Sequence, residues 1–314
     1  MPASSRGRGS TDSDVRPSRI GAIAVYCVAV GAVLWAQGAT APFRSRVDIV
    51  QVTVSVTDAN GRLITGLTQG DFQIFEDGIE QQITQFTDQR VPVSLGMLLD
   101  ASDSMRGQPA VDARDAFDRF VGELLLHEDE VFLATFNHLP RLITKWTMPP
   151  ASLRGRLSVL KPSGGTAIYD ALADTSRLFD QRLNLRAAMV VVSDGADTAS
   201  DRSLLQTIEV IRRSDAFVYA IAIDAPDGRE STRVNPEALR DITGLTGGYT
   251  EVVRSAGELG PATARIADEL NKQYTIGYSS SKPPDGNWRP LRVRVRTGGY
   301  YVRARRGYFA KAPR

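Results

Sequence analysis

The chain has very little cysteine and histidine. Its 314 residues include one cysteine and two histidines. The cysteine, Cys27, lies in an apolar stretch near the N-terminus, and removal of that stretch would leave no thiol. This excludes disulfides, thiolate metal sites and a cysteine nucleophile from such a mature protein. His127 and His138 each stand alone near the end of a predicted helix or strand, which favours a surface position over catalysis.

Two motifs of common α/β enzymes are also missing. The chain has neither the G-x-S-x-G nucleophile elbow nor the G-x-x-x-x-G-K phosphate loop. An aspartyl-phosphate enzyme would use Asp100 as its nucleophile. Such enzymes usually carry a second acid two residues later, where this chain has Ser102. We therefore favour a non-enzymatic binding protein. The alternative is a metal-dependent hydrolase or phosphotransferase with Asp100 as nucleophile.

Acidic residues are absent from the C-terminal segment. The whole chain has a net charge of +2, but Arg289 to Arg314 holds nine basic residues and no acidic one. Arg292, Arg294 and Arg296 lie on one face of a predicted strand, where charges discourage edge pairing with other chains. Binding to acidic surface polymers or lipid headgroups is the functional alternative. Nucleic acid is not an expected partner, because the protein is expected to be exported.

The N-terminal segment carries the signals for export. Residues 1–19 are polar and are expected to be disordered. Arg16 and Arg19 precede an apolar run from Ile20 to Ala36, and small residues follow as far as Ala41. This arrangement predicts a signal peptide within residues 20–41. Membrane anchoring through residues 20–36 is the alternative, although the run is short for a membrane span. Either way the body lies outside the cytoplasm, as a periplasmic, secreted or anchored protein.

Both flanks of the body show alternating apolar and polar residues. The pattern covers residues 46–90, where Asp77-Gly78 predicts a type I′ turn between strands at 72–75 and 80–86. It returns in residues 276–310. A few strands alone are marginally stable. We therefore expect the two flanks to form one small antiparallel β domain.

Residues 92–275 alternate between strands and helices, which predicts a Rossmann-like α/β fold with a doubly wound, mostly parallel sheet. Buried or edge strands are expected at Val93–Leu99, Glu130–Phe136, Arg141–Trp146, Ala187–Val192, Phe217–Ile223 and Gly248–Val253. Helices are expected at Ala113–Leu126, Ala151–Leu160, Ala167–Arg182, Leu204–Arg213, Pro236–Thr243 and Gly257–Gln273.

Oxygen donors follow the strands of this predicted sheet. Asp100, Ser102 and Ser104 come directly after the first strand, Thr166 lies in a Gly-rich loop, and Asp194 ends a later strand. Open α/β sheets bind ligands at the carboxyl ends of their strands. Hard cations such as Mg²⁺ take oxygen ligands. A metal site at this edge is therefore predicted; the alternative is that Ser102 and Ser104 only cap the next helix.

These residues resemble a known family. Asp100-Ala101-Ser102-Asp103-Ser104, Gly164-Gly165-Thr166 and Val191-Val192-Ser193-Asp194-Gly195 are similar to the three motifs of von Willebrand factor type A domains. The flanks resemble a bacterial, acidobacterial-type subfamily of such proteins. The resemblance implies an intact metal-ion-dependent adhesion site (MIDAS).

In that site, Ser102, Ser104 and Thr166 would ligate a cation through hydroxyls, and Asp100 and Asp194 directly or through water. Mg²⁺ is the expected ion, with Ca²⁺ or Mn²⁺ as alternatives. A carboxylate of a partner protein would fill the open position, for adhesion or assembly. The sequence names neither the partner nor the oligomeric state.

Overall fold

The structure is a computed structural model that describes residues 49–158, 160–224 and 235–310. The expected disordered segment 1–19, the signal peptide or anchor at 20–41 and Cys27 lie outside these residues. Within the described ranges, no helix is both long and apolar enough to cross a membrane.

A six-stranded sheet forms the centre of the α/β part, in the order β10-β9-β8-β5-β6-β7. Its strands are β5 (Val93–Asp100), β6 (Glu130–Phe136), β7 (Pro140–Thr147), β8 (Arg186–Ser193), β9 (Phe217–Ile223) and β10 (Thr250–Val253). All neighbours pair in parallel except β6 and β7, which are antiparallel. The predicted fold class is therefore confirmed.

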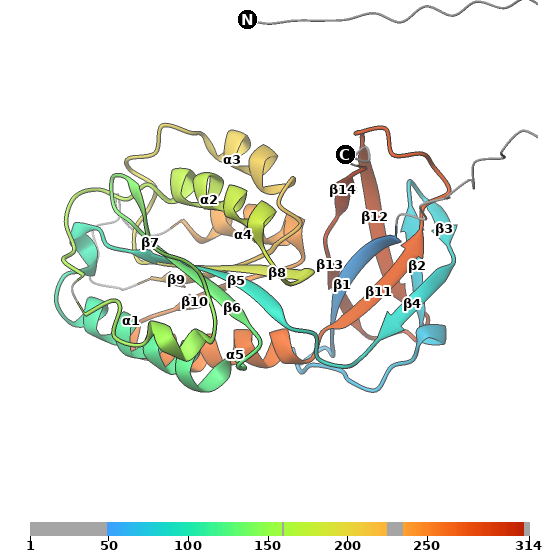
Figure 1. The fold of residues 1–314 in the computed structure, drawn as a ribbon, viewed down its shortest axis with the longest axis horizontal. Coiled ribbons are helices and arrows are strands. Elements are labelled where there is room, and N and C mark those ends of the chain that lie inside the picture. Colours follow the sequence, from blue (N-terminus) through green and yellow to red (C-terminus); the bar gives the residue numbers. More distant parts are fainter. Residues whose placement is uncertain (1–48, 159, 225–234, 311–314) are drawn as a thin grey trace, which may run out of the picture. The chain divides into compact units, whose positions relative to one another are not determined.

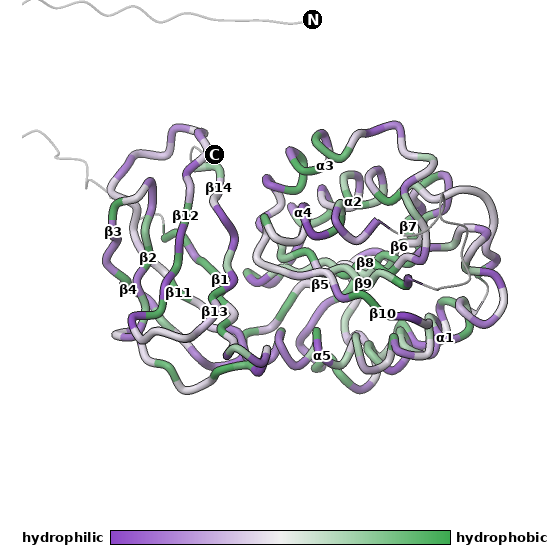
Figure 2. The backbone as a smooth tube through the Cα atoms, turned by 180° about the vertical axis from the view of Figure 1, so that it is seen from behind, coloured by the Kyte–Doolittle hydropathy of each residue, from purple (hydrophilic) through white to green (hydrophobic). Residues whose placement is uncertain are grey.

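Helices cover both faces of this sheet. They are α1 (Gln108–Arg119), α2 (Ile168–Ser176), α3 (Leu204–Ile211), α4 (Pro236–Thr246) and α5 (Leu259–Asn271). Helices α2, α3 and α4 lie on one face, and α1 and α5 on the other (Figure 1). Every residue of β5, β6, β8 and β9 is buried. The apolar stretches, green in Figure 2, therefore gather between the helix layers.

Local sequence signals account for several helix ends. Ser203 caps α3 in a capping box, in which its hydroxyl accepts from the Gln206 backbone and the Gln206 side chain accepts from the Ser203 backbone. Asn235 caps α4 and Pro236 occupies its first turn. Gly247, with φ of 94°, ends α4 in the left-handed conformation that glycine adopts readily.

Three predicted helices differ from the structure. In the predicted helix Ala167–Arg182, the α-helical part ends at Ser176 and Arg177–Gln181 form a 3₁₀ turn. Helix α1 begins at Gln108, earlier than the predicted Ala113, and runs on as a π-helical turn over Phe120–Leu124. The predicted helix Ala151–Leu160 is wrong, because only Pro150–Leu153 form a 3₁₀ turn. Gly155, with φ of 74°, then leaves the helical conformation. Other 3₁₀ turns are η1 (Gln69–Asp71), η2 (Asp103–Met105), η5 (Arg177–Gln181) and η7 (Ala256–Glu258).

Two four-stranded antiparallel sheets flank the α/β part, in the orders β13-β1-β11-β4 and β14-β12-β2-β3. Their strands are β1 (Ile49–Thr57), β2 (Phe72–Glu76), β3 (Ile79–Gln81), β4 (Ile83–Thr87), β11 (Tyr274–Ser279), β12 (Trp288–Val295), β13 (Tyr301–Ala304) and β14 (Gly307–Phe309). Each sheet combines strands that precede and follow the α/β part in sequence. Alternate residues of these strands, such as Val52, Val54 and Ile74, share one apolar core.

The turn between β2 and β3 has positive φ at both Asp77 (49°) and Gly78 (81°), as a type I′ turn requires. The single strand predicted at residues 80–86 is divided in the structure. Its first part, β3, pairs with β2, whereas β4 pairs with β11 in the other sheet.

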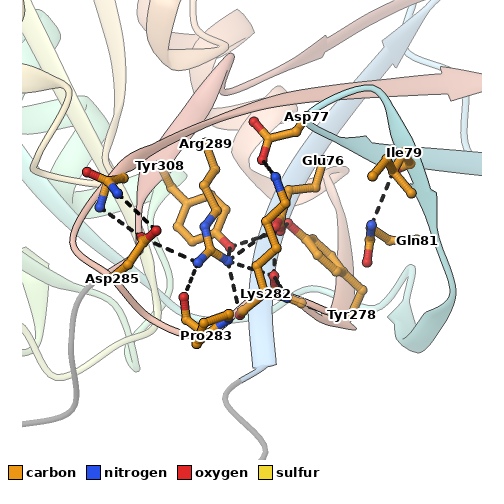
Figure 3. A network of polar contacts seen from close by, with 12 residues as sticks. Glu76, Asp77, Ile79, Gln81, Tyr278, Lys282, Pro283, Asp285, Arg289 and Tyr308 are labelled. Carbon is orange, nitrogen blue, oxygen red and sulfur yellow. Dashed lines mark hydrogen bonds and ion pairs between the residues drawn. The ribbon is translucent and has the colours of Figure 1, made fainter.

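The arginines of the C-terminal strands lie in different environments. Arg292 and Arg294 are exposed, as expected, and their guanidinium groups lie over the Phe75 ring. Arg289 instead is buried and pairs with Glu76, which also accepts from Tyr278 and Tyr308 (Figure 3). The basic segment is therefore only partly a solvated face.

Candidate metal site

Asp100 lies at the carboxyl end of β5 and its side chain is fully buried. Its Oδ1 accepts a hydrogen bond from the Ser102 backbone (2.7 Å), and its Oδ2 accepts from the Ser193 hydroxyl. Burial raises the pKa of Asp100 to about 6. The hydrogen bonds from Ser102 and Ser193 act in the opposite direction, and the nearby charge of Asp194 adds to the rise.

Ser102 and Ser104 follow on the same loop. Their hydroxyl oxygens lie 3.0 Å apart, and the Ser104 hydroxyl donates to Asp194 Oδ1 at 2.6 Å. Asp194 belongs to the loop after β8, the neighbour of β5 in the sheet. Burial raises its pKa as well, with the Ser104 hydrogen bond acting in the opposite direction. The loops after two adjacent strands thus bring both carboxylates and both serines together.

Helix capping does not account for the two serines. The Ser102 side chain makes no capping hydrogen bond to η2, and the N-cap of α1 is Gly107. The hydroxyls instead face each other and Asp194. Helix capping therefore does not explain the positions of these two hydroxyls.

Thr166 reaches the same place from the loop before α2. A Cβ placed on Gly195 would lie 3.1 Å from Thr166 Oγ1 and 3.8 Å from Ser104 Oγ, so these hydroxyls face one small space above Gly195. The Thr166 side chain is buried. All five predicted residues therefore lie at the carboxyl-end edge of the sheet, although no hydrogen bond joins the Thr166 hydroxyl to the other four within the described structure.

Several supporting residues were not predicted from the sequence. Ser193 donates to Asp100, and the Thr198 hydroxyl accepts from the Thr166 backbone at 3.1 Å. The Thr166 carbonyl in turn accepts from the Thr198 and Ala199 backbones. Asp197 accepts from the backbone of Tyr169, at the start of α2. For Asp197 and Thr198 the available signal was the polar run that follows Asp194, since such residues often hydrogen-bond to backbone groups. Ser193 lies before this run and had no such signal.

The donor set is compatible with a hard divalent cation. Two carboxylates and three hydroxyls converge, and neither carboxylate forms an ion pair with a described Lys or Arg side chain. A buried carboxylate without a positive partner is costly, and a bound cation would remove that cost. No three His, Cys, Asp or Glu side chains cluster in the described residues, so a cation here would depend on hydroxyls and water.

Comparisons with known proteins identify the family of this part of the chain. The sequence profile of the von Willebrand factor type A domain matches residues 95–196, which include all five residues of the site. The chain contains a von Willebrand factor type A (VWA) domain. A search of curated proteins found no match.

Solved structures show the same fold. A von Willebrand factor type A protein from Catenulispora acidiphila matches 85% of this chain and 75% of its own, with 13% identity and a TM-score of 0.52. Proximal thread matrix protein 1 from the mussel byssus, in a form with a zinc-occupied MIDAS motif, matches 63% of this chain with 16% identity and a TM-score of 0.52. The chain spans 50% of that mussel protein.

Proposed function

We propose that this protein is an exported, metal-dependent protein-binding module that acts in adhesion or assembly. Asp100, Ser102, Ser104, Thr166 and Asp194 would hold Mg²⁺, or Ca²⁺ or Mn²⁺ in its place. The observation that carries the proposal is the convergence of these oxygen donors around two carboxylates that form no ion pair with any Lys or Arg side chain in the described parts of the chain. We also propose that the chain is a member of an acidobacterial-type VWA subfamily, which its flanking segments resemble.

A bound cation would act as a Lewis acid toward an acidic group of a partner protein. Ser102, Ser104 and Thr166 would contribute neutral hydroxyls, which leave the cation attractive to a further carboxylate. Asp100 would contribute charge from a fixed position, because Ser102 and Ser193 hold both of its oxygens. The zinc-occupied MIDAS of the mussel protein supports binding of a divalent cation at this place in the fold.

The geometry disfavours Asp100 as a nucleophile. Its side chain is fully buried, and both carboxylate oxygens already accept hydrogen bonds. A nucleophile needs access to the substrate and a base or a lowered pKa, whereas burial raises the pKa of Asp100. We therefore propose a non-enzymatic role.

We also propose that residues 92–275 form the VWA domain and that 46–90 with 276–310 form the β domain. Export would depend on residues 20–41, as a cleaved signal peptide or a membrane anchor. Mass spectrometry of the exported protein would locate the N-terminus. A chain recovered intact from the cytoplasmic fraction would contradict the export proposal.

Calorimetric titration with Mg²⁺ tests the metal site. The wild-type chain should bind Mg²⁺, and Asp194→Ala should abolish binding. Asp103→Ala is the matched control, because Asp103 lies in the same motif but is exposed and pairs with Arg106 at 2.7 Å. Equal binding by wild type and Asp194→Ala would overturn the assignment.

A pull-down from envelope extract tests the partner. Proteins retained by the wild-type chain should be released by EDTA and should not be retained by Asp194→Ala. Turnover of a generic phosphoester or peptide, lost in Asp100→Asn, would favour the enzyme alternative instead.

A further inference from the structure

A cavity of about 490 Å³ lies beside the candidate metal site. The end of β6, the following turn, β7 and the loop that leads to Thr166 form its walls. Two lining residues connect it to the site. Ala101 directly follows Asp100, and the Ser163 backbone donates to the Ala101 carbonyl at 2.8 Å.

The charged residues that line this cavity are all cations. They are Arg141, Arg156 and Lys161, and no acidic residue is among the described residues of the lining. All three are exposed. None of them forms an ion pair with a described acidic side chain, in contrast to Arg289 and Arg303 of the β sheets. The cavity therefore has an uncompensated positive charge next to the predicted cation.

The cavity is also apolar. Phe136 and Leu157 form buried parts of its lining, while Leu139 and Leu142 are 61% and 40% exposed. Exposed leucines beside a concave surface are typical anchors for an apolar side chain of a partner. A ligand that suits both features needs negative charge and an apolar group.

The wall next to the metal site is held in place. Arg114 donates to the Leu160 carbonyl, and Arg106 donates to the Pro162 carbonyl at 3.1 Å. A cavity whose backbone is already positioned loses little conformational entropy on binding. These contacts use main-chain carbonyls and involve no side-chain atom of Arg156 or Lys161.

We propose that this cavity binds the part of the partner that adjoins the metal-bound carboxylate, and that this part is an acidic protein segment with an apolar side chain. The inference rests on the proposed function, because the same partner supplies the metal-bound carboxylate. It adds that the charge of the cavity and its exposed leucines select which acidic partners bind. A segment with a carboxylate alone would occupy the metal site without filling the cavity.

Three synthetic peptides serve as probes for the full chain in Mg²⁺. The first has one Asp in a Gly/Ser sequence, the second has Asp followed by Leu and Glu residues, and the third has Asp and Glu residues without Leu. Methyl NMR signals of Leu139 and Leu142 report binding, since shifts detect even weak complexes. We expect the second peptide to bind about tenfold more tightly than the first, because it adds apolar burial and charge contacts.

The double variant Arg141→Glu/Arg156→Glu should remove this advantage while Mg²⁺ binding in calorimetry persists. Lys145→Glu is the matched control, because Lys145 lies on the same strand as Arg141 and is exposed but does not line the cavity. Lys145→Glu should change the affinity ratio of the second peptide to the first by less than about twofold, because a remote exposed charge is largely screened. Asp194→Ala should weaken all three peptides.

The outcomes separate this inference from the proposed function. If the first peptide needs Mg²⁺ but the second binds no better, or the double variant has no effect, the cavity proposal is wrong and the metal site stands. If the third peptide equals the second, the apolar anchor is wrong and the proposal fails as stated. If the advantage depends on Arg141 and Arg156 but no peptide needs Mg²⁺, the cavity binds acidic, apolar segments, but the proposed function fails and so does the link between the cavity and a metal-bound carboxylate.

Discussion

The Ser104 hydroxyl donates a 2.6 Å hydrogen bond to Asp194 Oδ1 and thereby joins the loop after β5 to the loop after β8. The two residues are far apart in sequence but lie on loops of neighbouring strands. The same Ser104 oxygen lies 3.0 Å from that of Ser102. The hydrogen bond therefore positions one carboxylate and two hydroxyls for a common ligand.

A first prediction concerns Asp100→Asn. The buried Asp100 carboxylate pairs with no Lys or Arg side chain that the structure describes, so the neutral amide should leave the stability of the metal-free chain unchanged or increased. Both hydrogen bonds can persist, because Asn keeps one acceptor for the Ser102 backbone and its amide can donate to the Ser193 hydroxyl. A saturating cation should stabilise the wild-type chain by about 2.7 kcal/mol at roughly a hundredfold excess over Kd.

Thermal unfolding with Mg²⁺ and with EDTA measures both effects. The wild-type Tm should rise with Mg²⁺, and the Tm of Asp100→Asn should not. A large loss of stability of the variant in EDTA would show that the carboxylate is structurally required, contrary to this prediction.

A second prediction concerns Gly195→Ala. The new Cβ would lie 3.1 Å from Thr166 Oγ1, which is closer than most such contacts, so the hydroxyl must move. Mg²⁺ affinity should fall, by about tenfold if one ligand is lost, with little change in unfolding. Gly70→Ala is a control, since its Cβ would meet Thr68 Oγ1 at an ordinary 3.9 Å. Unchanged Mg²⁺ affinity in Gly195→Ala would argue against Thr166 as a ligand.

Four strands of the central sheet, β5, β6, β8 and β9, were predictable because they are buried on both faces. Such strands are continuous apolar runs, and the predicted strand Phe217–Ile223 has the bounds found in the structure. The donors that follow these runs must then lie at one edge of the sheet, as Asp100 and Asp194 do.

Local patterns could not reveal where the chain passes from one sheet to another. Residues 80–86 contain no glycine or proline that would mark a break. Even so, β3 and β4 pair in different sheets, because β4 pairs with a strand from the far end of the sequence. The helix predicted at Ala151–Leu160 failed for a local reason, since Gly155 adopts a positive φ there.

The supporting contacts of the site could not be predicted, because they join residues that are far apart in the sequence. The pairing of Ser193 with Asp100 exists only because β8 lies beside β5. The contact of Thr198 with Thr166 likewise joins separate loops. Serine and threonine occur in many loops, so residue type alone does not identify them.

A third prediction concerns Glu269, a buried residue of α5 that joins the VWA fold to the flanking sheets. It accepts from Ser55 of β1 at 2.8 Å and from Tyr219 of β9 at 2.9 Å, and it pairs with Arg303 of β13. Glu269→Ala would leave these donors without their acceptor. We expect a loss of about 3 kcal/mol in the free energy of unfolding, measured by urea denaturation.

The neighbouring residue supplies the control for Glu269. Asp268 forms an exposed pair with Lys272 on the same helix. Asp268→Ala should cost less than about 0.5 kcal/mol. Similar losses in the two variants would contradict the role given to Glu269.

A fourth prediction concerns pH and Glu76, which lies at the centre of the network in Figure 3. Burial alone would raise its pKa, but hydrogen bonds from Tyr278, Ser280 and Tyr308, together with the charge of Arg289, lower it below the reference value of 4.5. A carboxyl whose pKa is lowered by folding stabilises the protein above its unfolded pKa. That stabilisation is lost as the pH falls through the folded value.

The wild-type chain should therefore lose stability as the pH falls from about 5 to about 3, and Glu76→Gln should show a flatter curve. At neutral pH the variant should be less stable, because Arg289 is 3% exposed and would lose its charged partner. Glu80→Gln is the matched control, because Glu80 is exposed on the adjacent strand. Urea midpoints across this pH range measure the effect, and parallel curves for wild type and Glu76→Gln would contradict it.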